Sequence, residues 1–223
     1  MISWVKHTAD AQKARELFFF DEEGDENVVY LNGAFLGPTL RASVKAAQDG
    51  ILSQGKPWKT LSPTHFEKPL EDLREVFGDI INAPAQNITI VLSVAYAVAT
   101  AARHIGPRLE PGDKVLVLDS QFKSNILGWQ RLCDERNAEI EIIPQPEDGD
   151  WTNAVMKALE ADQPPKLLAL PAACHWCDGS FIDTVRITQR AHELQSLIFL
   201  DGTQSVGVEP IDVAVLKPDY LAV

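Results

Sequence analysis

The sequence is short of cysteine, of basic residues and of long hydrophobic runs, and each shortage argues against a class of protein. It contains three cysteines among 223 residues, an odd number without the spacing of a disulfide framework, so reduced thiols are expected rather than a stapled secreted domain. No hydrophobic run approaches the length that spans a membrane. The formal net charge of −12 disfavours binding to nucleic acid or to anionic membranes.

The first 20 residues also lack the features of a secretory signal. Charged side chains such as Lys6, Asp10 and Lys13 interrupt the apolar residues, which leaves neither a cationic start nor an unbroken apolar core. We therefore expect a cytoplasmic protein without a membrane or nucleic-acid partner.

One cysteine pair has a spacing that is also found in metal and redox sites. Cys174 and Cys177 form a CxxC motif that includes His175. A zinc site needs a second pair of ligands, and the sequence has no second CxxC and no HxxxH. We therefore expect no metal site.

Short apolar segments alternate with helical stretches over most of the chain. Since 45% of the residues are hydrophobic, the chain can build a substantial core. The alternation predicts an α/β fold, with a mostly parallel sheet flanked by helices on both faces and functional loops at the carboxyl ends of the strands. Strands are expected over 88–92, 114–118, 139–143, 166–170 and 197–200, with another beginning at 219–223, and helices over 94–106, 123–136, 151–160 and 183–194.

The region before the first of these strands is predicted to be different. Its pattern indicates an amino-terminal helix over 7–20 within an arm of residues 1–30. A loop rich in glycine and proline follows over 32–38, with helices over 39–53 and 70–76. Residues 31–223 contain no repeat and no low-complexity linker, so we expect them to form one large domain.

The motif that carries most chemical information follows the apolar segment 197–200. There Asp201, Gly202, Thr203 and Gln204 follow directly. A carboxylate at the end of a buried strand can keep the ring nitrogen of a cofactor protonated, because its charge acts strongly in a low-dielectric site. The alternative is a plain strand end with Gly202 forming a turn.

Two further segments fit a bound cofactor. An alanine-rich helix is expected to begin directly after a strand at Val94 and Ala95, and such a helix start suits a phosphate. Ala95 has no hydroxyl, so a side-chain contact to a phosphate would have to come from elsewhere. Phe122 follows the strand 114–118 and could cover one face of a ring. The alternatives are an ordinary buried strand-helix unit, and a core phenylalanine followed by a helix cap at Ser124.

A third loop, after the predicted strand 166–170, contains His175. A histidine at that place is a candidate general base. The alternative is a histidine that only makes hydrogen bonds in a loop.

In their order and spacing, these motifs resemble the fold-type I enzymes that depend on pyridoxal 5'-phosphate (PLP), and specifically the class V aminotransferase family. That family includes cysteine desulfurases, kynureninases and proteins like isopenicillin N epimerase. The resemblance runs from about Tyr30 to Val223. It implies that the backbone amides of Val94 and Ala95 bind the cofactor phosphate and that Phe122 stacks on the ring. It further implies that Asp201 pairs with the ring nitrogen and Gln204 bonds the phenolic oxygen.

The resemblance also assigns residues outside these three motifs. Trp176 aligns with a position near the oxygen side of the ring that is often asparagine, and is implied to contact the cofactor or line the substrate pocket. Asn32 and Ala34 fall in the segment that approaches the substrate carboxylate. The implied substrate is an amino acid, with transfer, lyase or epimerase chemistry, and the implied assembly is a homodimer.

The lysine that forms the Schiff base in this family is missing. Lys217 lies in the loop before the last predicted strand, so we do not assign it this role, and no other lysine fits. We expect an incomplete PLP-binding large domain over 31–223, without a carboxyl-terminal small domain and inactive alone. The alternative is a naturally short, noncatalytic cofactor-binding or assembly module. A nucleotide-binding α/β enzyme is disfavoured, because neither GxGxxG nor GxxxxGK followed by Ser or Thr occurs.

Overall fold

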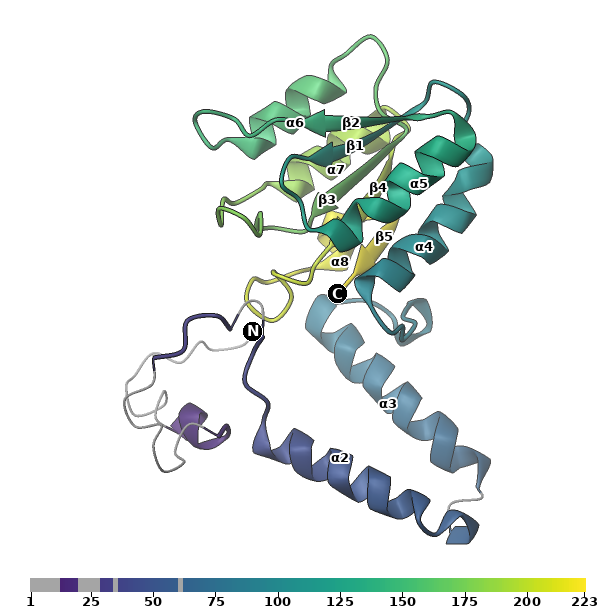
Figure 1. Ribbon diagram of the computed structural model, residues 1–223, viewed down its shortest axis with the longest axis vertical. Coiled ribbons are helices and arrows are strands. Elements are labelled where there is room, and N and C mark those ends of the chain that lie inside the picture. The colour runs from purple at the N-terminus through teal and green to yellow at the C-terminus, as the bar shows by residue number, and fades with distance from the viewer. Residues whose placement is uncertain (1–12, 20–28, 34–35, 60–61) are drawn as a thin grey trace. The chain divides into compact units, whose positions relative to one another are not determined.

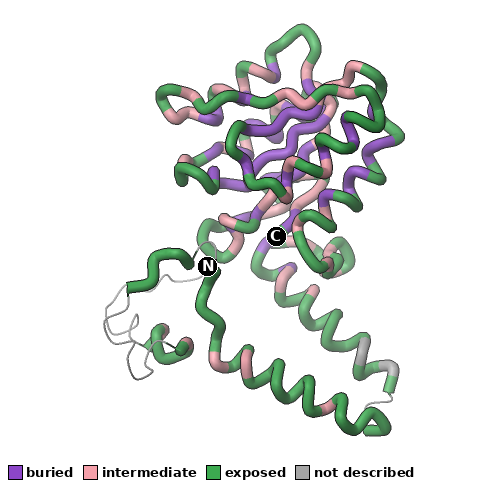
Figure 2. Tube along the Cα trace, in the orientation of Figure 1, coloured by how far each residue is buried: buried purple, intermediate pink, exposed green. Residues whose placement is uncertain are grey.

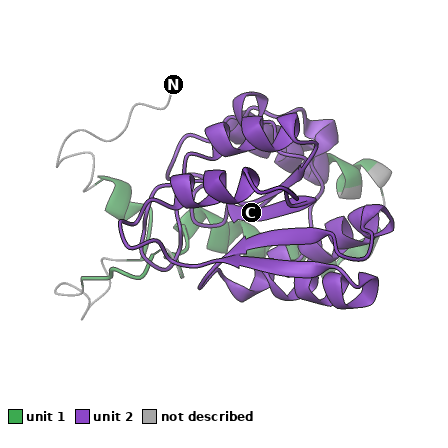
Figure 3. Cartoon of the chain, turned by 90° about the horizontal axis from the view of Figure 1, so that it is seen from above, with its two compact units in different colours: residues 1–68 green, residues 69–223 purple. Residues whose placement is uncertain are grey.

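A computed structural model describes residues 13–19, 29–33, 36–59 and 62–223. The chain divides into two compact units, Met1–Lys68 and Pro69–Val223 (Figure 3). Of the helix predicted over 7–20, only 13–19 are described, and residues 13–16 of these are helical.

The first unit contains the helix α2 (Arg41–Gln54), where a helix over 39–53 was predicted. None of its residues is buried. A short 3-10 helix, η1 (Pro57–Lys59), follows. The next helix, α3 (Pro63–Ile81), crosses the boundary between the units and includes the helix predicted over 70–76.

The second unit is built on a five-stranded sheet in which every pairing is parallel, so the predicted fold class is confirmed (Figure 1). Four strands lie within one residue of their predicted bounds, and the last is shorter. The order across the sheet is β2-β1-β3-β4-β5. The strands are β1 (Lys114–Leu118), β2 (Glu139–Ile143), β3 (Leu167–Pro171), β4 (Leu197–Asp201) and β5 (Tyr220–Ala222).

Helices cover both faces of this sheet because alternate strand residues point to opposite sides. Leu116, Leu168 and Ile198 pack with α6 (Trp151–Leu159), α7 (Thr184–Glu193) and α8 (Val213–Leu216) on one face. Val115, Leu167 and Phe199 pack with α4 (Val94–Ile105) and α5 (Leu127–Arg136) on the other. Figure 2 shows buried residues concentrated along these strands.

The strand predicted over 88–92 is wrong. Among the described residues this segment forms no pairing with the sheet, and a 3-10 helix, η2 (Ala85–Asn87), precedes it. Ile90 and Leu92 are 47% and 95% exposed. An apolar, β-branched run has strand propensity, but a strand also needs a hydrogen-bonded neighbour, and propensity alone does not supply one.

Close packing of α4 against α5 gives a test of this arrangement. A Cβ placed on Gly128 would lie 2.6 Å from Cγ1 of the fully buried Val98. We expect Gly128→Ala to lower the free energy of unfolding by about 1–3 kcal/mol through overpacking, as measured by urea denaturation. Gly50→Ala, in α2 with open space around it, should be neutral or stabilising by up to about 1 kcal/mol.

Adding Val98→Ala to Gly128→Ala tests whether the destabilisation comes from the clash between the new Cβ and Val98 or from a change in the stability of α5 itself. Because Val98 supplies the atom that is too close, the two changes should cost less together than the sum of their separate effects. Additive costs would contradict the packing described.

Candidate functional site

The candidate site lies at the carboxyl edge of the sheet, where the direction of the chain across the sheet reverses. The chain passes from β1 outward to β2, and then returns past β1 to β3 and on to β4 and β5. The segments after β1 and β3 lead to helices on opposite faces. A reversal of this kind opens a crevice at the carboxyl ends of the two central strands, where α/β proteins bind ligands.

Asp201 is the last residue of β4, at this edge, and is partly buried. Its Oδ1 accepts hydrogen bonds from the Thr203 backbone N–H at 3.1 Å and from the Thr203 hydroxyl at 2.7 Å. Two donors on one oxygen fix the rotation of the carboxylate, and Oδ2 has no bond to another described residue. The role of Thr203 could not be predicted from the sequence, because it shows only in the contact with Asp201. Gln204, three residues after Asp201, is also partly buried.

Helix α4 begins at the same edge, beside the carboxyl end of β5 (Figure 1). The Ser93 hydroxyl caps this helix by accepting from the Tyr96 backbone N–H at 3.2 Å. The N–H groups of Val94 and Ala95 have no acceptor in the described part of the chain. Ser93 thus brings a hydroxyl to the start of α4, two residues before Ala95. Because this hydroxyl accepts the bond from Tyr96, its own proton is still available for donation.

The segment after β1 presents Phe122, whose side chain is 43% exposed. Gln121, immediately before it, is buried and donates from Nε2 to the carbonyl oxygens of Asn125 at 3.0 Å and Ala169 at 3.1 Å. These bonds tie the segment to β3. The helix predicted over 123–136 is interrupted at Ile126, between η4 (Lys123–Asn125) and α5, and Ser124 is not its cap.

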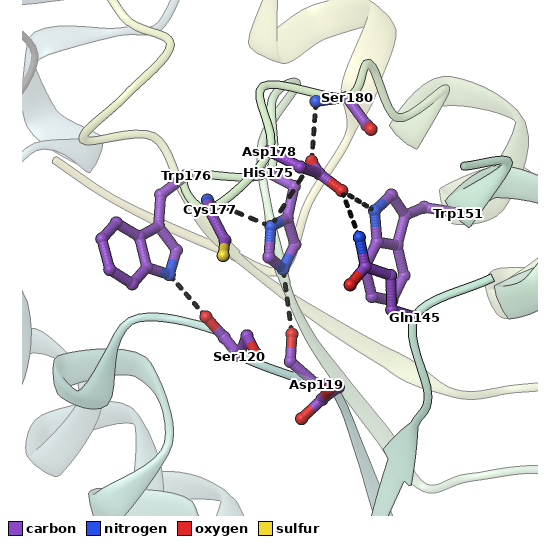
Figure 4. A network of polar contacts seen from close by, with 9 residues as sticks. All are labelled: Asp119, Ser120, Gln145, Trp151, His175, Trp176, Cys177, Asp178 and Ser180. Carbon is purple, nitrogen blue, oxygen red and sulfur yellow. Dashed lines mark hydrogen bonds and ion pairs between the residues drawn. The ribbon is translucent and has the colours of Figure 1, made fainter. Parts of the chain in front are cut away.

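His175 lies in the segment after β3 and is 1% exposed (Figure 4). Its Nδ1 accepts from the Cys177 backbone N–H at 3.2 Å, and its Nε2 lies 3.0 Å from the Asp119 carbonyl oxygen. With Nδ1 accepting from Cys177, the ring proton that Asp119 accepts lies on Nε2. Asp178 Oδ1 also lies 3.7 Å from Nδ1. The ring also stacks on Trp151, with centroids 4.7 Å apart. Both nitrogens are thus engaged in bonds to the backbone, which favours a structural role for His175 over that of a general base.

Trp176, which follows, is 48% exposed, and its ring faces the segment after β1. Its indole N–H donates to the Ser120 carbonyl oxygen at 2.6 Å. Its ring meets that of Phe122 edge to face, at 5.4 Å between centroids and 88° between planes.

Asp178 anchors the same segment, a role that the sequence analysis missed. It accepts from the Ser180 backbone N–H at 2.8 Å, the Trp151 indole at 3.1 Å and the Gln145 amide at 3.4 Å (Figure 4). Partial burial alone would raise the pKa of Asp178, but the bonds from Ser180 and Trp151 outweigh it and bring the pKa below the ordinary value of 3.8. Trp151 and Gln145 come from distant parts of the sequence, so no local pattern identifies these two partners.

The two predicted substrate-binding residues belong to the other compact unit. Asn32 is exposed, and its carbonyl oxygen accepts from the Leu36 backbone N–H at 3.1 Å. Ala34 lies outside the described residues.

The described cysteines are free thiols. Burial raises the pKa of Cys133 to about 11. Burial, and after it the charge of Glu209, also raises the pKa of Cys174. Cys177 is exposed. No group of three potential metal ligands occurs within the described residues.

Lys217 lies away from Asp201. It ends α8 in a left-handed conformation and comes just before β5. Because β4 and β5 are parallel, this places Lys217 at the amino edge of the sheet, opposite to the carboxyl edge where β4 ends at Asp201.

The sequence matches a family of known enzymes. Residues 57–223 match the model of the family described as aminotransferase class-V, and the chain belongs to that family. A cysteine desulfurase of Pectobacterium atrosepticum is 28% identical over 153 residues, which are 68% of this chain and 37% of that protein. A probable cysteine desulfurase of Pyrococcus abyssi is 27% identical over 154 residues, with the same two shares. The chain thus spans well under half the length of these relatives.

Solved structures share the fold. A cysteine desulfurase from Thermococcus onnurineus NA1, in its apo form, superposes with a TM-score of 0.78 at 19% identity, covering 94% of this chain and 52% of that one. A variant of the protein C-DES, with glycine covalently linked to its PLP cofactor, superposes with a TM-score of 0.77 at 22% identity, covering 93% of this chain and 54% of the other. In the described part of this chain, no helix is long and apolar enough to cross a membrane.

The contacts of Asp178 generate a prediction about pH. Asp178→Asn should lower the free energy of unfolding at neutral pH by about 1–3 kcal/mol, because it weakens hydrogen bonds to a charged acceptor. The folded-state pKa is depressed, so the stabilisation is present above the ordinary value of 3.8 and is lost as the pH falls through the folded pKa. The difference between variant and wild type should therefore shrink on acidification, as measured by denaturation at a series of pH values. Asp162→Asn, at an exposed loop position, is the control, and a difference independent of pH would contradict the assignment.

Proposed function

We propose that this chain binds PLP at the carboxyl edge of its sheet and that the protein it represents acts on an amino acid. Membership of the class V aminotransferase family supports this, as does the PLP carried by C-DES. When bound, PLP supplies an electron sink that stabilises negative charge at the substrate Cα.

The donors and acceptors of the site fit such a cofactor. The N–H groups of Val94 and Ala95, which no described residue accepts, lie at the positive end of the α4 dipole and suit a phosphate dianion. Phe122 offers a half-exposed aromatic face that can pack on a ring and exclude water from it. Asp201 offers Oδ2 as an acceptor for a protonated ring nitrogen, and the partly buried Gln204 is proposed for the phenolic oxygen.

The observation that carries the proposal is the position and fixation of Asp201. It ends β4 beside β3, in register with Pro171, and Thr203 bonds only its Oδ1. The carboxylate is thus oriented before any ligand binds. Pre-orientation is what distinguishes a binding group from an ordinary acid at the end of a strand.

The finer identity of the substrate is proposed from the relatives. Those from Pectobacterium and Pyrococcus are named cysteine desulfurases, and C-DES is titled a cystine C-S lyase. We therefore propose a sulfur-containing amino acid as the substrate. On the grounds of the amino-terminal sequence and of the family resemblance, we also propose a cytoplasmic location and a homodimer. Asn32 and Ala34 are proposed to approach the substrate carboxylate.

A noncatalytic cofactor-binding module is the second candidate, favoured by the position of Lys217 at the amino edge of the sheet.

The cofactor proposal is tested by binding of pyridoxamine 5'-phosphate, which has no aldehyde to react with surface lysines. We expect the 223-residue chain to bind it, as followed by ligand fluorescence, and Asp201→Asn to weaken binding about 10- to 100-fold, since a charged hydrogen bond is lost. Asp162→Asn should bind like wild type. Equal binding by Asp201→Asn, or no binding by wild type, would contradict the proposed site.

Reduction with borohydride after addition of PLP tests whether a lysine of this chain forms a Schiff base with the cofactor. We expect no lysine to be labelled stoichiometrically, as determined by peptide mass spectrometry. Specific labelling of one lysine, lost in Asp201→Asn, would contradict the view that this chain provides no Schiff-base lysine.

A further inference from the structure

The segments after β1 and β3 are joined by two adjacent hydrogen bonds across the point where the chain direction reverses. His175 Nε2 donates to the Asp119 carbonyl oxygen, and Trp176 Nε1 donates to that of Ser120 (Figure 4). Consecutive donors thus meet consecutive acceptors. We call these contacts the cross-loop bonds.

On the side of β3, the donors are held by contacts that do not involve the candidate site. His175 lies against the indole of Trp151, the first residue of α6. Asp178 binds the same indole and the Ser180 backbone N–H. The buried position of Trp151, at 1% exposure, makes it a rigid support for the segment that carries Trp176.

On the side of β1, the acceptors lie just before Phe122. Ser120 has a positive φ of 55°, a conformation that costs energy in a residue with a side chain and persists only where surrounding contacts maintain it. The bond from Trp176 to the Ser120 carbonyl is one such contact. The rings of Trp176 and Phe122 then meet edge to face.

Trp176 has one polar atom, and that atom is already bonded to Ser120. It therefore has no donor left for the oxygen of a cofactor. We propose that Trp176 is a positioning residue that acts through Phe122. The cross-loop bonds fix the backbone before Phe122, and the perpendicular contact with the indole fixes the plane of its ring. The identity of the ligand that Phe122 covers rests on the proposed function. The positioning of Phe122 by Trp176 does not depend on it.

The positioning is tested without any ligand, by amide hydrogen exchange of the 223-residue chain. In Trp176→Ala, exchange over residues 119–125 should rise by about tenfold, because the bond to Ser120 and the ring contact are both lost. Trp176→Phe, which keeps an aromatic ring but loses the N–H, should be intermediate. Phe181→Ala is the matched control, since it removes an exposed aromatic from the same connection between β3 and α7 and should leave 119–125 unchanged. Unchanged exchange in Trp176→Ala would overturn the proposal, whether or not PLP binds.

A double-mutant cycle tests the route through Phe122. Trp176→Ala alone should weaken binding of pyridoxamine 5'-phosphate about 3- to 10-fold, the range expected for loss of an aromatic pair. In a Phe122→Ala background, Trp176→Ala should leave the affinity for pyridoxamine 5'-phosphate almost unchanged, because the ring that Trp176 positions is already absent. Equal effects in both backgrounds would show direct contact between Trp176 and the ligand and would overturn the proposal. Failure of the wild type to bind would contradict the proposed function, and the exchange experiment would then decide the positioning alone.

Discussion

The parallel pairing of β1, β3 and β4 is the constraint on which the rest of the structure depends. It brings the ends of three strands that are distant in sequence to one edge of the sheet. Phe122, Trp176 and Asp201 follow or end these strands, so their common position at the carboxyl edge is a consequence of the strand pairing. The two apolar clusters on opposite faces stabilise this register, because a shift by one residue would turn every strand side chain to the wrong face.

Polar contacts then convert a shared edge into defined geometry. Thr203 orients Asp201, Ser93 caps the helix that offers free N–H groups, and Asp178 ties the segment after β3 to Trp151. Each of these contacts satisfies a backbone or charged group at the end of a regular element. Groups in such places need partners for stability, and here the same contacts orient residues at the carboxyl edge of the sheet.

Most of the fold could be predicted from the sequence, because strand and helix periodicities are local. The apolar segment over 88–92 shows the limit, since its pattern predicts a strand and the described structure offers it no neighbour. The positions of Asp201 and Phe122 at strand ends also follow from local pattern. The hydrogen bonds of His175 and the roles of Asp178 and Thr203 could not be predicted, because they depend on the folded structure. For His175, the contacts with Trp151 and Asp119 form only after folding.

The most direct test of the account is the protonation state of the cofactor ring nitrogen, read by nitrogen-15 NMR of pyridoxamine 5'-phosphate labelled at that atom and bound to this chain. If Asp201 lies against the ring nitrogen, the bound nitrogen will show the shift of the protonated form at a mildly alkaline pH where the free ligand has lost that proton. Asp201→Asn will then show the shift of the neutral form. A bound nitrogen that titrates as it does in free solution would contradict the central claim.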